Sequence, residues 1–235
     1  LMGRMAWSRM DGLLLISGAF GMFDKKTVMD AGGYNTNTVG EDMELLVRMR
    51  RIMRTQNIDY TVGFIPDPLC WTEVPQKWSI LHRQRNRWTR GTAETLWLHR
   101  AMIFNPKYKV LGMLSTPYWL FFEWLAPIIE FTGILFFIVL LCLGQINWLF
   151  ALSFFLVSYS FGILYSITAL LFEEYSFQQY KKTNYIYKLI ITACLEPIFY
   201  HPFLLWASLK GNIDLFRGRK TWGTMSRSGL RNAAK

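Results

Sequence analysis

Two short groups of residues have types and spacing that suit transfer chemistry. The first is Gly40-Glu41-Asp42, in which two carboxylates follow a glycine. The second is Gln84-Arg85-Asn86-Arg87-Trp88, which places amides and two guanidinium groups beside an indole. A positioned carboxylate can take a proton from an attacking hydroxyl. Amide and guanidinium donors can stabilise the negative charge that develops on departing phosphate oxygens.

The two carboxylates lie at the start of a predicted helix. From residue 41 onward, apolar residues fall on one face and the arginines elsewhere, a pattern typical of an amphipathic helix. The apolar positions are Leu45, Leu46, Met49, Ile52 and Met53. The helix dipole favours acidic side chains in a first turn, so capping is the alternative explanation of Glu41, Asp42 and Glu44.

An α/β layer is expected around this helix. Residues 12–16 and 60–65 are strand candidates, and residues 25–31 suit one or two helical turns that end at Gly32-Gly33. Ser17-Gly18-Ala19 follows the first strand candidate, and such small residues let the backbone approach a ligand closely. A buried strand turn would explain them equally well. The alternation of strands and helices predicts an α/β domain.

The second half of the chain has the composition of a membrane region. A helix from about residue 78 to 100 mixes tryptophans with arginines, which suits a membrane surface. Residues 118–143 and 148–172 are long enough to cross a hydrocarbon core of about 30 Å. Residues 187–209 carry polar residues and prolines in their middle, which predicts a broken or interfacial segment. These are Glu196, Pro197, His201 and Pro202.

The charge pattern bears on topology and partners. The formal net charge is +10, and hydrophobic residues make up 52% of the 235 residues. Lys and Arg cluster beside the apolar segments, which predicts that these flanks face the cytoplasm. No helix-turn-helix, zinc or RNA-recognition pattern accompanies the clusters, so nucleic acid is not an expected partner. The chain opens at Leu1 without a signal segment, and we expect it to be part of a longer protein.

In their order and spacing, with 42 positions from Asp42 to Gln84, the motifs resemble those of family 2 processive glycosyltransferases. That family includes cellulose, hyaluronan, chitin and poly-N-acetylglucosamine synthases. The resemblance implies the C-terminal half of a GT-A-like α/β domain with its interfacial helix in residues 1–104. A membrane region would follow in residues 105–211, and a cytoplasmic basic tail in residues 212–235.

The resemblance also implies an activity. It is inverting transfer of a sugar from a UDP-sugar donor to a growing polysaccharide, at the cytoplasmic face of a bacterial plasma membrane. Asp42 would be the base that takes the acceptor hydroxyl proton, with Glu41 as its positioning neighbour. Gln84, Arg85 and Arg87 would contact the donor pyrophosphate.

The resemblance places the acceptor sugar against Trp88, whose flat face suits a pyranose ring, and near Ser17 and Gly18. For an isolated tryptophan, membrane anchoring is the alternative. Near the C-terminus, Trp222 and Arg227 resemble a tail of poly-N-acetylglucosamine-type synthases that would fold over the nucleotide site. A solvated basic tail is the alternative there.

The sequence departs from the family pattern in one respect. These enzymes carry a metal-binding Asp-x-Asp upstream of the base, and this sequence has no Asp-x-Asp. Mg²⁺ or Mn²⁺ is therefore expected to bind through ligands that precede Leu1, and the fragment alone is expected to be inactive. Two alternatives stay open: transfer of one sugar to a lipid-linked acceptor, and a non-catalytic membrane scaffold that binds sugar.

Overall fold

The chain forms two compact units. The computed structural model describes residues 2–16, 18, 20–67, 69–70, 72–177 and 183–219. Unit 1 comprises Leu1–Ile128 together with Ala207–Lys235, and unit 2 comprises Ile129–Trp206. Each unit is considered by itself.

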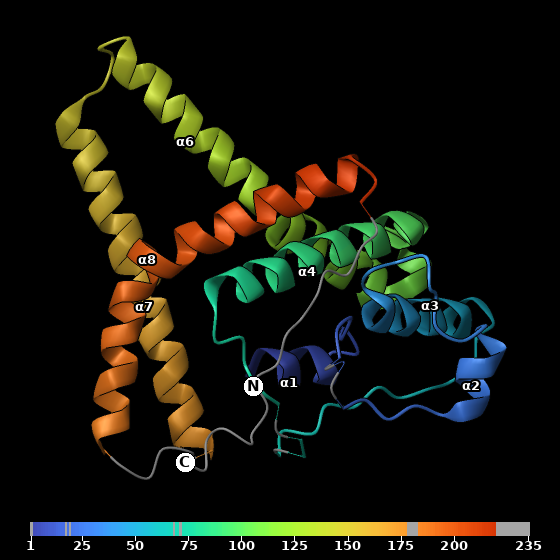
Figure 1. The fold of residues 1–235 in the computed structure, drawn as a ribbon. Helices are drawn as coiled ribbons and strands as arrows, with labels where there is room; N and C mark the ends of the chain where they lie inside the picture. The colour runs from blue at the N-terminus through green and yellow to red at the C-terminus, as the bar shows by residue number, and fades with distance from the viewer. Residues whose placement is uncertain are drawn as a thin grey trace. The chain divides into compact units, whose positions relative to one another are not determined.

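The described part of unit 1 is helical (Figure 1). Its first helices are α1 (Met2–Arg9), α2 (Lys25–Asp30), α3 (Glu41–Thr55) and α4 (Trp78–Leu98). Two 3-10 turns, η1 (Arg100–Met102) and η2 (Pro106–Tyr108), lead into a long helical stretch. That stretch alternates π-helical and α-helical turns: η3 (Leu111–Ser115), α5 (Thr116–Tyr118), η4 (Trp119–Leu125) and α6 (Ala126–Cys142). Helices α3 and α4 lie side by side.

The apolar face of α3 forms the core of unit 1, and the helix begins at Glu41 as the sequence predicts. One buried cluster joins the face to the loop before α2 and to η2 and η3: Leu14, Met43, Val47, Met102, Tyr108 and Leu111. A second joins it to the end of α2: Ala31, Leu45 and Met49. Burial of this kind contributes about 25 cal/mol for each Å² of apolar surface removed from water. The core therefore holds α3, and with it the carboxylates of its first turn.

The two segments predicted as strands are extended loops. The described residues contain no strand, so the expected α/β layering is not seen in them. Backbone groups of both segments bond to side chains instead. Arg50 Nη1 donates to the carbonyl oxygen of Leu13 (2.5 Å), and the Phe64 N–H donates to Ser8 Oγ (3.0 Å). A strand requires a neighbouring strand to pair its backbone groups, and neither segment has one here.

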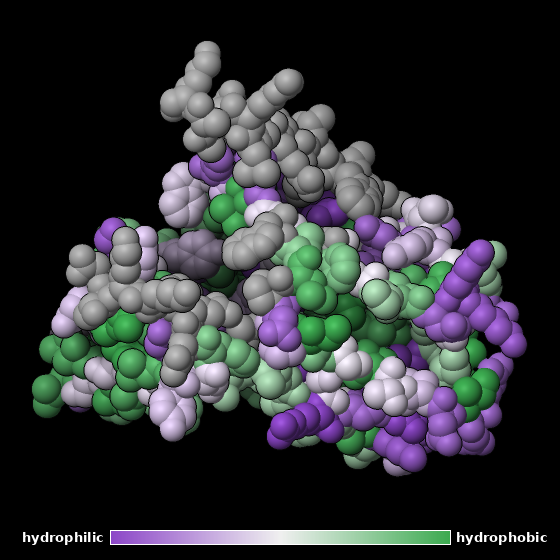
Figure 2. Space-filling model, turned by 90° about the horizontal axis from the view of Figure 1, so that it is seen from below, coloured by the Kyte–Doolittle hydropathy of each residue, from purple (hydrophilic) through white to green (hydrophobic). Residues whose placement is uncertain are grey.

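Unit 2 contains most of α6, all of α7 (Trp148–Phe177) and the larger part of α8 (Thr183–Phe216). In the described residues three stretches are long and apolar enough to cross a membrane: Leu111–Cys142, Trp148–Phe177 and Tyr185–Phe216. Figure 2 shows hydrophobic side chains over the helices of unit 2, at the left of the view. It shows hydrophilic ones over the edge of unit 1 that carries α2.

Helix α8 corrects one expectation from the sequence. The segment 187–209 was expected to be broken or interfacial. Helix α8 runs unbroken through Pro197 and Pro202, so the expected break is not seen, and an interfacial position stays a prediction. A proline inside a helix removes a backbone hydrogen bond, which is tolerated in membrane helices where neighbouring groups bind the freed carbonyls. The Tyr159 hydroxyl of α7 donates to the carbonyl oxygen of Cys194 (2.8 Å), so α7 contacts α8 three residues before Pro197.

Candidate active site

The carboxylates Glu41 and Asp42 open helix α3. Gly40 occupies the N-cap position and supplies no side-chain cap, so the first N–H groups of the helix are available to other acceptors. The Asp42 carboxylate takes one of them, because its Oδ1 accepts from the Met43 N–H (2.8 Å). This hydrogen bond holds the Asp42 side chain at the start of the helix.

A pocket of about 330 Å³ lies in front of the two carboxylates. Its lining combines aromatic and small residues with the acids: Ile16, Gly18, Phe20, Gly21, Phe23, Tyr34, Glu41 and Asp42. Gly18 is in direct contact with the base candidate, since a β-carbon at residue 18 would stand 2.5 Å from Asp42 Oδ2. Two of the predicted site residues far apart in the sequence are thus neighbours. Ser17, also predicted at this site, lies outside the described residues.

Glu41 links the first motif to the second. Burial raises the pKa of Glu41, and the charge of Asp42 raises it further, while the positive charge of Arg87 opposes the shift. Within the described residues, Glu41 Oε2 is buried without a hydrogen-bond partner. The charge of Arg87 on α4 therefore acts on Glu41, which links the start of α3 to one guanidinium of the second motif.

The other residues of the second motif follow α4 outside the pocket lining. The Arg85 guanidinium lies over the Trp88 ring, with its Cζ 4.5 Å from the ring centroid. Such cation–π contacts orient both side chains. The Trp88 side chain is nonetheless 48% exposed, so part of its surface remains open to a ligand. Gln84 is half-buried on the same helix.

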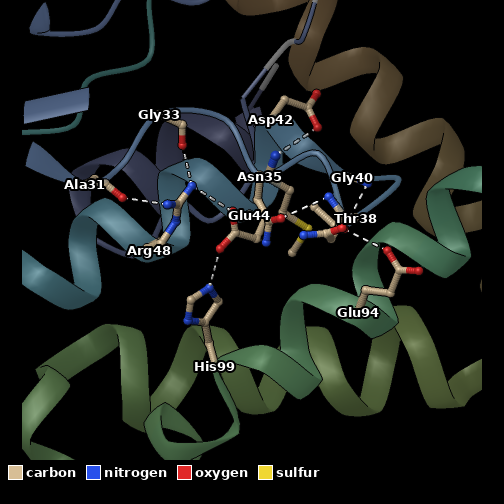
Figure 3. A network of polar contacts seen from close by, with 12 residues as sticks. Ala31, Gly33, Asn35, Thr38, Gly40, Asp42, Glu44, Arg48, Glu94 and His99 are labelled. Atoms are coloured by element: carbon tan, nitrogen blue, oxygen red, sulfur yellow. Dashed lines mark hydrogen bonds and ion pairs between the residues drawn. The ribbon is translucent and has the colours of Figure 1, made fainter. Parts of the chain in front are cut away.

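Two glycines set the distance between the two motifs. A β-carbon on Gly40 would stand 2.7 Å from the Cα of Gly91, so the start of α3 touches the backbone of α4. A carboxylate on α4 reinforces this contact (Figure 3): Glu94 Oε2 accepts from Thr38 Oγ1 (2.7 Å) and from the Val39 N–H (2.9 Å). Because α3 starts at this contact, the position of its first-turn carboxylates relative to α4 is fixed.

A buried polar network behind the pocket was missed by the sequence analysis. His99 Nε2 lies 3.2 Å from Glu44 Oε1, and Glu44 Oε2 pairs with Arg48 (3.1 Å). Arg48 in turn donates to the carbonyl oxygens of Ala31 and Gly33, both at 2.5 Å. Figure 3 shows Asp42 pointing away from Glu44 and His99, so this network supports α3 from behind.

The pKa of Glu44 reflects this network. Burial alone would raise that pKa, but the hydrogen bond from His99 and the charge of Arg48 outweigh it and lower the pKa. A partial signal was present in the sequence, because Glu44 and Arg48 have the i,i+4 spacing of a helical ion pair. Nothing in the sequence indicated that His99, 55 positions from Glu44, would be its partner.

Some predicted features fall outside the site or outside the described residues. Trp222 and Arg227 lie in the part of the chain that the structure does not describe. Among the described residues, no group of three or more His, Cys, Asp or Glu side chains is placed to hold a metal ion. The described residues therefore do not by themselves form a site for a divalent cation.

A carboxylate pair thus lines a pocket in unit 1, and helices long and apolar enough to cross a membrane follow it in the chain. A family model described as glycosyl transferase family group 2 matches residues 1–172. The chain belongs to this family. No solved structure shows a significant match to it.

Curated relatives extend the comparison. The Bacillus subtilis (strain 168) protein named "Probable glycosyltransferase YdaM" is 28% identical over 107 residues, which cover 46% of this chain and 23% of that protein. The poly-beta-1,6-N-acetyl-D-glucosamine synthases of Staphylococcus epidermidis and of Staphylococcus aureus (strain COL) are each 33% identical over 81 residues. Those matches cover 34% of this chain and 18% of each synthase. The chain thus spans between 18% and 23% of the length of these relatives.

Proposed function

We propose that the protein containing this chain is an inverting glycosyltransferase. It would move a sugar from a UDP-sugar to a growing polysaccharide at the cytoplasmic face of a bacterial plasma membrane. The observation that carries the proposal is the pocket in which Asp42 and Glu41 meet Gly18, with the charge of Arg87 acting on Glu41. Membership of the glycosyl transferase family and the names of the two staphylococcal synthases support it.

The proposed step uses Asp42 as the base. Asp42 accepts the proton of an acceptor hydroxyl while that oxygen forms a bond to the anomeric carbon of the donor sugar. The bond from the anomeric carbon to the phosphate oxygen breaks, and its electron pair leaves with UDP. Attack and departure on opposite faces invert the anomeric configuration. Asp42 suits this role because its carboxylate is anchored to the Met43 N–H and lines the pocket.

The arginines of the second motif suit the other end of the reaction. Arg87 and Arg85, with Gln84, would donate to the phosphate oxygens on which negative charge develops. Trp88 would offer the exposed part of its ring to the acceptor sugar, with Ser17 and Gly18 nearby. Trp222 and Arg227 of the basic tail would cover the nucleotide site. The whole catalytic domain is proposed to have a GT-A-like α/β fold.

A divalent cation belongs to the same proposal. Mg²⁺ or Mn²⁺ would neutralise the charge on the departing diphosphate when bound, through ligands that precede Leu1. The described residues form no such ligand group, so the residues named above are assigned only to proton acceptance, phosphate contact and sugar contact.

The test is incorporation of radiolabelled sugar by membranes that contain the full-length protein. Several UDP-sugars are supplied with Mg²⁺ or Mn²⁺, the product is sized, and membranes without the protein are the control. A long product supports the proposal and identifies the donor sugar. A single-sugar product would replace the polysaccharide with a lipid-linked acceptor. No incorporation by folded protein would favour a sugar-binding scaffold.

A further inference from the structure

Helix α4 carries buried polar residues on the side opposite its exposed tryptophan. Asn86 lies inside the Gln84–Trp88 motif and is 6% exposed, and Arg90, one turn later, is 5% exposed. Arg90 Nε donates to Asn86 Oδ1 (3.0 Å). Burying an amide and a guanidinium is costly unless both are well hydrogen-bonded, so their partners indicate what this face is built to hold.

The partners come from the end of α8, which belongs to unit 1. Asn86 Nδ2 donates to Asp214 Oδ2 (3.0 Å), across 128 positions of sequence. Arg90 Nη1 donates to the backbone carbonyl oxygen of Arg219 (2.5 Å). Asp214 also pairs with Arg219 (3.2 Å) and with Lys210 (3.6 Å). The end of α8 is therefore fastened directly to the motif helix by charged and hydrogen-bonded groups.

The two helices also touch through their backbones. A β-carbon on Gly211 would stand 2.8 Å from the carbonyl oxygen of Asn86 and 3.0 Å from Thr89 Cβ. Ala207, one turn earlier, is fully buried. At the next residue of α8, Asn212 Oδ1 accepts from Trp124 Nε1 (2.7 Å). Such close packing leaves α4 little freedom to rotate about its axis.

The electrostatics of the contact depend on Asp214. Burial lowers the pKa of Arg90, and the negative charge of Asp214 opposes that effect. Without the Asp214 charge, less negative charge would offset the buried positive charge of Arg90. Removing one partner of such a buried pair destabilises a protein strongly.

We propose that the end of α8, residues 207–219, is a positioning clamp for the Gln84–Trp88 motif, in which Asn86 and Asp214 are the central positioning residues. The clamp fixes the rotation of α4 and so sets where Arg87 and Trp88 stand relative to the carboxylates of α3. This role rests on the proposed function, since it matters for catalysis only if the motif contacts substrate. Residues 207–216 of the clamp are also the last residues of the candidate span Tyr185–Phe216, so the clamp and the rest of that span belong to one helix.

The test exchanges the two side chains of the pair in the full-length protein. Asp214→Asn removes the charge, and Asn86→Asp places a second carboxylate against Asp214. Each single variant is expected to lower kcat by about 10- to 100-fold, the cost of a small misplacement of reacting groups. The double variant Asn86→Asp/Asp214→Asn restores one amide-to-carboxylate hydrogen bond and keeps a carboxylate beside Arg90. It is expected to recover to within about threefold of the unmodified protein.

A matched control and a second variant accompany the exchange. Asp59→Asn makes the same chemical change at an exposed position and is expected to leave kcat unchanged. Gly211→Ala keeps every polar group but forces a methyl group against the Asn86 carbonyl, and it is expected to lower kcat like Asp214→Asn. This variant keeps the proposal testable if a charge change prevents folding.

A second readout does not depend on activity. Backbone amide hydrogen exchange at residues 84–88 is expected to rise in both single variants and to return to its original level in the double variant. If the unmodified protein transfers no sugar, the proposed function fails, and this exchange result alone decides whether the clamp exists. Equal exchange in all variants would overturn the clamp. The clamp would also be overturned if the kcat of the double variant were no higher than that of the less active single variant.

Discussion

The Asp42 carboxylate packs directly against Gly18, so closely that any side chain at position 18 would clash with it. A β-carbon built at residue 18 stands 2.5 Å from Asp42 Oδ2 and 3.4 Å from its Cγ. The obstacle is the end of a flexible side chain rather than backbone, so a larger residue at position 18 would turn the Asp42 carboxylate away. Gly18 is thus required for the orientation of the proposed base.

Gly18→Ala is therefore expected to reduce sugar transfer while leaving the protein folded. Displacing the base by about 1 Å lowers kcat by about 10- to 100-fold. The melting temperature should change little, because Asp42 can rotate to make room. Transfer rates and thermal melting check this, and Gly63→Ala is the control because a β-carbon there meets nothing within 4 Å. Equal losses in both variants would contradict the prediction.

Asp42→Asn tests the base itself. The amide keeps the shape of the carboxylate but cannot take a proton, so kcat is expected to fall by about 10²- to 10⁴-fold. Binding of the UDP-sugar, measured by calorimetry, should persist. Asp59→Asn again serves as the exposed control, and unchanged turnover in Asp42→Asn would remove Asp42 from the mechanism.

Gly91→Ala is expected to destabilise unit 1. Alanine favours a helix over glycine by about 1 kcal/mol, which alone would stabilise α4. A β-carbon on Gly91 would stand 2.7 Å from the Cα of Gly40, however, and backbone cannot move aside as a side chain can. Overpacking of about 1–3 kcal/mol should therefore prevail. A lower melting temperature than that of Gly63→Ala would agree with this, and a higher one would show that the helices separate without strain.

Glu41 and Glu44 are expected to give opposite pH dependences from the same helix. Burial raises the pKa of Glu41 above its usual 4.5, so its ionisation costs stability as pH rises through the folded value. Glu41→Gln should gain in melting temperature relative to the original protein as pH rises from about 4 to about 7. A difference in melting temperature between Glu41→Gln and the original protein that does not vary with pH would contradict this.

Glu44 provides the contrast. Its pKa is lowered, because the His99 hydrogen bond and the Arg48 charge outweigh burial, so its stabilising contribution is present above 4.5 and lost as pH falls through the folded value. Glu44→Gln should therefore lower the melting temperature at neutral pH, with the difference closing under acid conditions. Thermal melting of both variants across one pH series measures the two signs together.

Local sequence patterns predicted the helices well because their causes are local. The start of α3 at Glu41 is confirmed, and its apolar periodicity matches the buried face that includes Leu45 and Met49. The strand prediction for residues 12–16 is not confirmed in the described residues, because a strand depends on a partner segment that a local pattern cannot specify. The continuity of α8 through Pro197 was likewise not predicted, because a proline in the sequence does not by itself show whether the helix ends there.

The supporting contacts of the site were harder to predict than the motifs themselves. Asn86 stands in the middle of a recognisable motif, yet its partner Asp214 is 128 positions away. The contact of Gly40 with Gly91 has the same character, since only the packed helices show why each position lacks a side chain. The individual roles assigned to Gln84, Arg87 and Trp88 stay predictions for the experiments above.

Within unit 2, Glu130 of α6 and His201 of α8 form a hydrogen-bonded pair between two helices that are each apolar enough to cross a membrane. His201 Nε2 lies 2.9 Å from Glu130 Oε1 and 3.0 Å from Oε2. Both side chains are partly exposed, so in a bilayer hydrocarbon would replace water around them. An ionisable group in that environment is costly unless it is paired.

The pair is therefore expected to show a non-additive effect on stability. Glu130→Leu and His201→Leu each leave one polar partner alone and should lower the melting temperature in detergent. The double variant removes both polar groups and should be more stable than either single variant. Tyr165→Leu, at a 71% exposed position of the same unit, controls for a new leucine on the helix surface. A double variant whose loss equals the sum of the two single losses would show that the pair contributes no coupling between α6 and α8.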